Sequence, residues 1–131
     1  MNSYNGFTSE KRMEVHRWLR AEEAAGRLVW PTECEACGQT QGIFDCHHEN
    51  YDEPLSYVGL CYLCHLMLHC RFSNAEAWRR YGEAIGRGVR YQPLFTRNFG
   101  IVRALLAGEA VAFTLYEPPL QDLFSRILWT K

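Results

Sequence analysis

The chain has 131 residues, of which 47% are hydrophobic, and this composition is typical of a single globular domain spanning residues 1–131. The net charge of −1 at pH 7 gives no bulk electrostatic attraction to nucleic acid. No apolar run near the N-terminus resembles a signal peptide or a membrane span, so we expect a cytoplasmic protein without a membrane partner. In a reducing compartment, six cysteines indicate metal ligands or redox centres more than disulfides.

The first element is a helix predicted over residues 9–25. This segment contains no proline or glycine and carries Val15, Trp18 and Leu19 at helical spacing. Gly26 follows at a position where glycine commonly ends a helix, and Pro31 then breaks the chain.

The next segment, residues 34–70, holds two CxxC pairs separated by residues 38–60. Two thiolates on one tight turn can reach a metal ion from the same side, and a second such turn completes a tetrahedron. Gly38 suits the backbone angles of the first turn. The pattern predicts a structural Zn²⁺ site formed by Cys34, Cys37, Cys61 and Cys64.

Three alternatives to this zinc site remain open. Cys61, Cys64 and His65 also form CxxCH, the attachment motif of c-type haem, which would require export. A redox CxxC of the thioredoxin type would require a surrounding βαβ pattern. Finally, Cys46 or Cys70 could replace one of the four assumed ligands.

Four of the five histidines lie within the same segment, and only His16 stands apart in the first helix. His65 and His69 are four residues apart in a predicted helix, so their imidazoles share one face and can bind one cation, or can simply pack there. His47 and His48 are neighbours in an extended stretch, residues 43–48, and should point to opposite sides.

These motifs resemble the HNH endonucleases, in particular small phage and bacterial members with a four-cysteine zinc site. The resemblance covers residues 34–70 and rests on His47, His48, Glu49, Asn50, Tyr51, Asp52, Glu53, Pro54 and Leu55, followed by Leu60, Cys61, Tyr62, Leu63, Cys64, His65 and His69. It implies a ββα-metal core with His47, His65 and His69 as ligands of a second divalent cation and His48 as the catalytic general base.

The chemistry implied by the resemblance is phosphodiester hydrolysis. A neutral imidazole with a pKa of roughly 6.5 can accept a proton from water near pH 7. The second cation would be Mg²⁺, Mn²⁺, Ni²⁺ or Zn²⁺, since imidazole favours later transition metals and phosphate oxygens also suit harder ions. The central Asn of the family pattern is replaced by Ser56, whose shorter side chain would orient the base less firmly.

Helices and one strand are predicted for the C-terminal packing region, residues 73–131. Ser73 and Glu76 fit a capping box at the start of a helix over residues 74–85. Residues 86–97 are expected to be irregular, Asn98 to cap a short helix that ends at Gly108, and residues 111–115 to form a strand. A last amphipathic helix is predicted over residues 119–128.

Charge is distributed unevenly along the chain. Residues 34–72 hold one basic residue against five acidic ones, a balance of −4 that suits cation binding, and residues 73–103 hold six arginines against two glutamates, a balance of +4. We interpret the second block either as a solvated face or as a nucleic-acid-binding surface that contains Arg79, Arg80, Arg87 and Arg90.

The sequence therefore predicts an α+β fold, with an HNH-like ββα-metal core held together by a four-cysteine zinc site and flanked by helices. The predicted function is a metal-dependent endonuclease whose partner is nucleic acid, with DNA favoured. The alternative is a catalytically inactive zinc-binding module that binds DNA or a protein partner. A redox protein is the third hypothesis.

Overall fold

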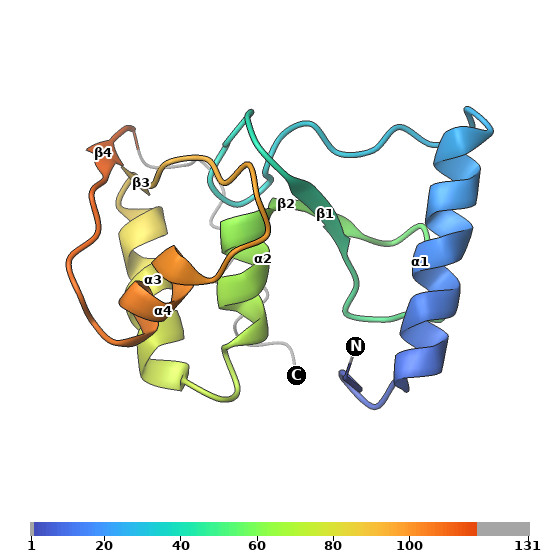
Figure 1. Ribbon diagram of the computed structural model, residues 1–131, viewed down its shortest axis with the longest axis horizontal. Helices are drawn as coiled ribbons and strands as arrows, with labels where there is room; N and C mark the ends of the chain where they lie inside the picture. The colour runs from blue at the N-terminus through green and yellow to red at the C-terminus, as the bar shows by residue number, and fades with distance from the viewer. Residues whose placement is uncertain (1, 118–131) are drawn as a thin grey trace.

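The computed structural model describes residues 2–117, and within this range the fold is α+β with four helices and two small antiparallel sheets. Figure 1 shows α1 at one end of the molecule, the β1–β2 hairpin and α2 in the middle, and the remaining elements at the other end. The elements in chain order are α1 (Ser9–Ala24), β1 (Phe44–His47), β2 (Val58–Cys61), α2 (Tyr62–His69), α3 (Ala75–Gly86), β3 (Val89–Arg90), α4 (Gly100–Leu106) and β4 (Thr114–Leu115).

Helix α1 occupies the segment predicted to be helical and ends one residue earlier, at Ala24. Its start is set by Thr8, whose side chain accepts a hydrogen bond from the backbone N–H of Lys11. Val15 and Leu19 lie on its buried face. Although α1 has 16 residues, neither it nor any other helix within residues 2–117 combines the length and apolarity needed to cross a membrane.

The central hairpin pairs β1 with β2, and His47 lies opposite Val58 in the antiparallel register. Because side chains alternate along a strand, Asp45 and His47 share one face of β1, and Cys46 points to the other face. Strand β2 ends at Cys61, which is also the N-cap of α2, so the hairpin passes directly into the helix.

Two hydrophobic clusters lie on either side of this hairpin. The larger cluster surrounds the buried face of α2, where Cys64, Met67 and Leu68 pack against α3 and α4. The smaller cluster joins Val15 and Leu19 of α1 to Tyr4 and Tyr51. The hairpin and α2 are therefore held from both sides.

Helix α3 starts one residue later than predicted, and its cap is a different residue. The Asn74 side chain accepts from the backbone N–H of Ala77 at 3.1 Å, so the predicted Ser73–Glu76 capping box is wrong. The reason lies in the turn after α2, where the Ser73 hydroxyl donates to the Cys70 carbonyl. Glu76 instead forms an ion pair with Arg79.

The elements after α3 follow the predictions in part. Residues 86–97 were expected to be irregular but contain β3. The strand expected over residues 111–115 is shorter, because only Thr114 and Leu115 pair with the two residues of β3. Asn98 was predicted to cap α4, but the N-cap is Phe99, without a side-chain cap hydrogen bond, and Asn98 precedes it and accepts from the N–H of Gly100. The helix predicted over residues 119–128 lies outside the described residues.

Gly42 makes a close contact that joins the hairpin to the segment before α4. It has φ of 86°, and a Cβ atom built on it would lie 2.5 Å from the Leu94 carbonyl oxygen, which also accepts from the N–H of Ile43 at 2.9 Å. Gly26 has φ of 77° with no atom near its Cβ position.

We expect Gly42→Ala to lower the free energy of unfolding by more than Gly26→Ala in urea denaturation. Both substitutions place a side chain in the left-handed region, at a cost of about 1–2 kcal/mol, but only the first also displaces backbone. Equal losses in the two variants would show that the contact with Leu94 contributes nothing.

Candidate functional site

The first candidate site is a cluster of four cysteine side chains at the start of α2. Cys34, Cys37, Cys61 and Cys64 each offer a sulfur, and these atoms all lie within 4.8 Å of one another. Cys37 Sγ and Cys61 Sγ are 3.8 Å apart. Tetrahedral Zn²⁺ with bonds of about 2.3 Å requires sulfurs about 3.8 Å apart, so the spacing is compatible with a structural zinc site.

Local backbone structure brings the first pair of cysteines together. The Cys34 carbonyl accepts from the N–H of Gly38, and the Cys34 N–H donates to the Gln39 carbonyl. Gly38 has φ of 78°, a value that glycine adopts without steric cost, as the sequence predicted. The second pair spans the β2–α2 junction, where the Cys61 sulfur accepts from the N–H of Cys64.

The pKa values of the thiols in this cluster shift in different directions. Hydrogen bonds from the neighbouring thiols lower the pKa of Cys34, whereas the hydrogen bond to Cys34 raises the pKa of Cys61 and burial raises that of Cys64. A single thiolate is therefore stabilised at the expense of the others. The Tyr81 hydroxyl, 3.1 Å from Cys64 Sγ, can donate to a thiolate there.

Cys46 and Cys70, the two alternative ligands, lie outside the four-sulfur group. Cys46 belongs to β1, where burial raises its pKa to about 12, and Cys70 is the C-cap of α2. All six cysteines are free of disulfides. The four ligands predicted from the CxxC pairs are therefore the ones that the fold brings together.

The second candidate site consists of three histidines on the other side of α2. His47, His65 and His69 each offer a ring nitrogen, and these atoms also lie within 4.8 Å of one another. The Nε2 atoms of His65 and His69 are 3.0 Å apart. With metal–nitrogen bonds of about 2.0–2.1 Å, this separation corresponds to an angle of about 90–95° at a shared ion.

Two carboxylates set which nitrogens of this cluster can bind a cation. Asp45 Oδ2 accepts from Nδ1 of His65 at 3.0 Å, and Glu49 Oε2 accepts from Nε2 of His47 at 2.5 Å. Each histidine therefore keeps its lone pair on the opposite nitrogen. For His47 this nitrogen is Nδ1, which is buried and has no hydrogen-bond partner among the described residues. An unpartnered buried lone pair fits a cation site.

The ionisation of these groups is consistent with cation binding. Burial lowers the pKa of His47 to about 4 and also lowers that of His69, so both are neutral at pH 7. Burial alone would raise the pKa of Asp45 and Glu49, but hydrogen bonds from His65 and Arg97 to the first, and from His47 and Tyr4 to the second, lower both. The carboxylates are therefore ionised acceptors.

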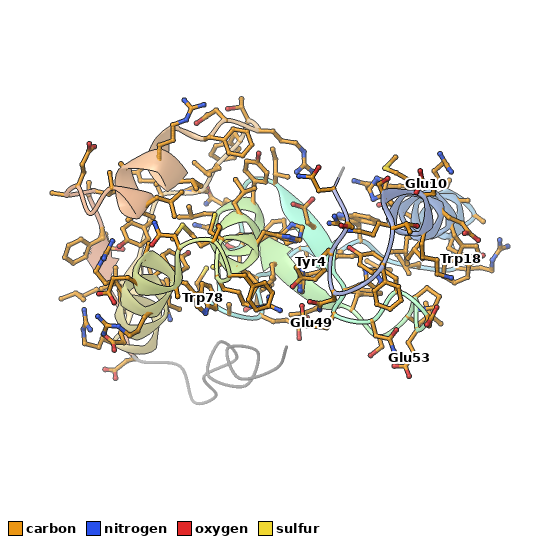
Figure 2. The ribbon with its side chains drawn as sticks, turned by 90° about the horizontal axis from the view of Figure 1, so that it is seen from below. Tyr4, Glu10, Trp18, Glu49, Glu53 and Trp78 are labelled. Carbon is orange, nitrogen blue, oxygen red and sulfur yellow. The ribbon has the colours of Figure 1, made fainter. Side chains whose placement is uncertain are left out.

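Asp45, Glu49 and Tyr4 had no predicted role. The signal for the carboxylates was the spacing of two residues on each side of His47, which places alternate side chains of an extended segment on one face. Tyr4 carried no such signal, because its hydroxyl reaches Glu49 from the N-terminal segment at 2.6 Å. Figure 2 shows Tyr4 and Glu49 close together between α1 and α2.

His48 points away from His47, as expected for neighbours in an extended segment. Its Nε2 lies 2.8 Å from the Pro54 carbonyl oxygen, which can only accept, so Nε2 carries the proton and Nδ1 is left as an acceptor. The ring is 2% exposed and lies near Tyr51 and Tyr57. Burial lowers its pKa, which keeps the imidazole neutral at pH 7.

Ser56 is exposed, and its backbone N–H donates to the Glu53 carbonyl. Its hydroxyl makes no hydrogen bond within residues 2–117. The contact that orients His48 comes instead from the backbone at Pro54.

A groove of ≈ 1020 Å³ lies beside the histidines and is lined by residues of both α1 and α2. His48, His65 and His69 line it from the hairpin and α2, and His16 lines it from α1. The sequence analysis had set His16 apart, since nothing in the sequence places α1 opposite α2.

The four arginines predicted to bind nucleic acid do not line this groove. Arg79 is paired with Glu76 and Glu83 on the surface of α3. Arg80 lies 3.7 Å from Glu76, Arg87 is exposed at the end of α3, and Arg90 donates to the carbonyl oxygens of Ile85 and Val89.

Comparison of the chain with models of protein families, with curated proteins and with solved structures finds no significant match.

For the cysteine cluster, we expect the purified protein to contain one zinc ion per chain and to lose it in Cys61→Ser. Removal of a thiolate from a tetrahedral site weakens zinc binding, and the lost binding energy destabilises the fold around α2. Elemental analysis and thermal unfolding measure both effects.

The matched control is Cys46→Ser, which removes a half-buried thiol outside the cluster and should leave the zinc content unchanged. Wild-type protein without zinc, or equal loss of zinc in the two variants, would contradict this ligand set.

Proposed function

We propose that this protein is an HNH-type endonuclease that hydrolyses phosphodiester bonds of nucleic acid, with DNA favoured as substrate. In this proposal the hairpin and α2 form the ββα-metal core, and Zn²⁺ bound by Cys34, Cys37, Cys61 and Cys64 holds that core together. A second divalent cation, Mg²⁺, Mn²⁺, Ni²⁺ or Zn²⁺, is bound by His47, His65 and His69.

The observation that carries the proposal is that two of the proposed metal ligands, His47 and His65, are each hydrogen-bonded to a carboxylate, while His48 is held nearby by a backbone carbonyl. Asp45 and Glu49 direct the free nitrogens of His65 and His47 away from themselves, and carboxylate–histidine pairs of this kind orient and strengthen metal ligands. A purely packed histidine cluster would have no need for two ionised partners.

When bound, the divalent ion supplies Lewis-acid stabilisation of negative charge on the scissile phosphate and on the departing 3′ oxygen. His48 accepts a proton from the attacking water through Nδ1, because its Nε2–H is held by the Pro54 carbonyl. His48 lines the same groove as His65 and His69, which allows base and phosphate to approach the same site.

The second candidate is a catalytically inactive zinc module that binds DNA or a protein partner. It is favoured by the exposure of Ser56, which takes the place of the family's central Asn without making its contact, and by the near-complete burial of His48. In the endonuclease proposal the Pro54 carbonyl replaces the orienting side chain, so the two candidates differ in whether His48 can reach water.

A plasmid-nicking assay with each divalent ion distinguishes these candidates. We expect metal-dependent nicking by the wild type and a loss of 10²–10⁴-fold, the usual range for a general base, in His48→Gln. Glutamine can still donate to the Pro54 carbonyl, so the fold and zinc content should persist, but it cannot accept the proton.

The control for this assay is Tyr57→Phe, which alters a ring next to His48 without removing a base. We expect it to retain nicking within a few-fold of wild type. Absence of nicking with every divalent ion would favour the inactive module.

We expect Asp45→Asn to weaken binding of Mn²⁺ or Ni²⁺ at the histidine site by about 10–100-fold. The amide no longer provides the charged acceptor that fixes the His65 ring, and the loss is measured by calorimetric titration of zinc-loaded protein. The control is Asp52→Asn, whose carboxylate pairs with Lys11 at the surface. Unchanged affinity in Asp45→Asn would remove the carboxylate from the metal site.

A further inference from the structure

The groove beside the histidines carries positive charge that the overall charge of −1 does not reveal. Its charged lining residues within the described part of the chain are three arginines, Arg12, Arg20 and Arg97, and one aspartate, Asp45. Counted over these four side chains alone, three positive charges and one negative charge leave a surplus of two, and Glu23, which does not line the groove, pairs with Arg20. Arg12 is buried and donates to the Tyr51 hydroxyl, so Arg20 and Arg97 are the accessible charges.

Arg20 and Arg97 are held in similar settings on different segments. The Arg20 guanidinium lies 3.5 Å from the ring centroid of Trp30 and pairs with Glu23 at 2.8 Å. Its side chain remains 43% exposed. Stacking on an indole fixes the plane of the guanidinium and leaves its other face open.

Arg97 reaches the groove from the segment before α4. Its guanidinium lies 5.0 Å from the ring centroid of Tyr62 and makes two hydrogen bonds to Asp45, at 2.8 and 3.2 Å, and its side chain is 50% exposed. Asp45 also accepts from His65, so Asp45 connects Arg97 to the histidine cluster. Its place in the groove is therefore next to the proposed reacting phosphate.

The charges of Arg20 and Arg97 both act on the imidazole of His16. Burial lowers its pKa, and the charges of Arg20 and Arg97 lower it further, while that of Asp45 acts in the opposite direction. The same ring meets Trp30 edge to face. The two guanidiniums therefore act on one region of the groove.

Exposed aromatic rings complete the lining. Phe72 and Phe99 line the groove with 52% and 48% of their surface exposed. A positively charged groove with accessible aromatic and guanidinium faces is the arrangement by which proteins bind unpaired nucleotides, since bases stack on the rings while cations follow the phosphates. In a duplex the base faces are already stacked on one another and cannot use these rings.

We propose that this groove binds a single strand of nucleic acid, with Arg20 and Arg97 contacting phosphates beside the histidine cluster and unpaired bases stacking on Phe72, Phe99 and the open face of Arg20. The inference names the substrate class of the proposed nuclease site and rests on that function. It assigns strand binding to the groove, in place of the arginines of α3.

The test measures binding without cleavage, using full-length protein that holds one zinc ion per chain and no second divalent ion. Fluorescence anisotropy reports binding of a labelled twelve-residue thymidine oligonucleotide, and of a duplex of the same length, over a range of NaCl concentrations. We expect the single strand to bind at least tenfold more tightly than the duplex.

Arg20→Gln is compared with Arg79→Gln. Both arginines are exposed and pair with a glutamate three residues away, Arg20 with Glu23 and Arg79 with Glu76. We expect Arg20→Gln to weaken single-strand binding by roughly fivefold and to lower the slope of log affinity against log salt by about 0.7, the value for one phosphate contact on a single strand. Arg79→Gln should change affinity by less than about twofold.

Equal binding of duplex and single strand, or an equal or larger loss in Arg79→Gln than in Arg20→Gln, would overturn the inference. Failure of the proposed nuclease function has a different signature. Tight single-strand binding that depends on Arg20, together with no nicking under any divalent ion, would support the binding groove and contradict the catalytic role of His48.

Discussion

The structure depends on the convergence of four cysteine sulfurs, three of them on buried residues, at a spacing compatible with a shared metal ion. The sulfurs of the two CxxC pairs lie within 4.8 Å of one another at the start of α2, where Cys34, Cys61 and Cys64 are buried and Cys37 is half-buried. Mutual repulsion and burial would keep most of these thiols protonated, and a metal ion is the partner that stabilises all four as thiolates. Zinc bound here would fix the Cys34–Cys37 turn against the β2–α2 junction.

The position of the cysteine cluster also determines the position of the histidine cluster, because α2 contributes to both. Neighbouring residues of a helix are about 100° apart, so Cys64, held toward the larger core, directs His65 and then His69 toward the opposite side. Strand β1 meets this side with His47, because its alternation sends Cys46 and His48 the other way. The two candidate metal sites therefore share one helix, and the position of the histidines follows from the position of the cysteines.

The charges that line the groove beside the histidines come from residues far apart in the sequence, so a count of charge along the chain did not predict them. Residues 73–103 form the most basic stretch, yet Arg79 within it is neutralised locally by two glutamates of its own helix. Arg20 and Arg97, separated by most of the chain, line one groove together. Ion pairs offset charge at both places, since Arg20 pairs with Glu23 and Arg97 with Asp45, but only the groove gathers arginines from distant segments beside the histidines.

The sequence by itself determined the chemistry of the ligands. The CxxC spacing predicted which four cysteines come together, and the i, i+4 spacing predicted that His65 and His69 share a face. The adjacency of His47 and His48 predicted that they point to opposite sides, whereas the place of His47 beside the other two histidines was implied only by the resemblance. These features depend on local periodicity, which is set by backbone geometry. Only the tertiary structure decided the partners of these residues. The contacts of Tyr4 with Glu49 and of His48 with the Pro54 carbonyl, and the place of His16 in the groove, depend on how α1 and the loop between β1 and β2 pack. Such packing results from many weak contacts between segments, and no local pattern in the sequence specifies them.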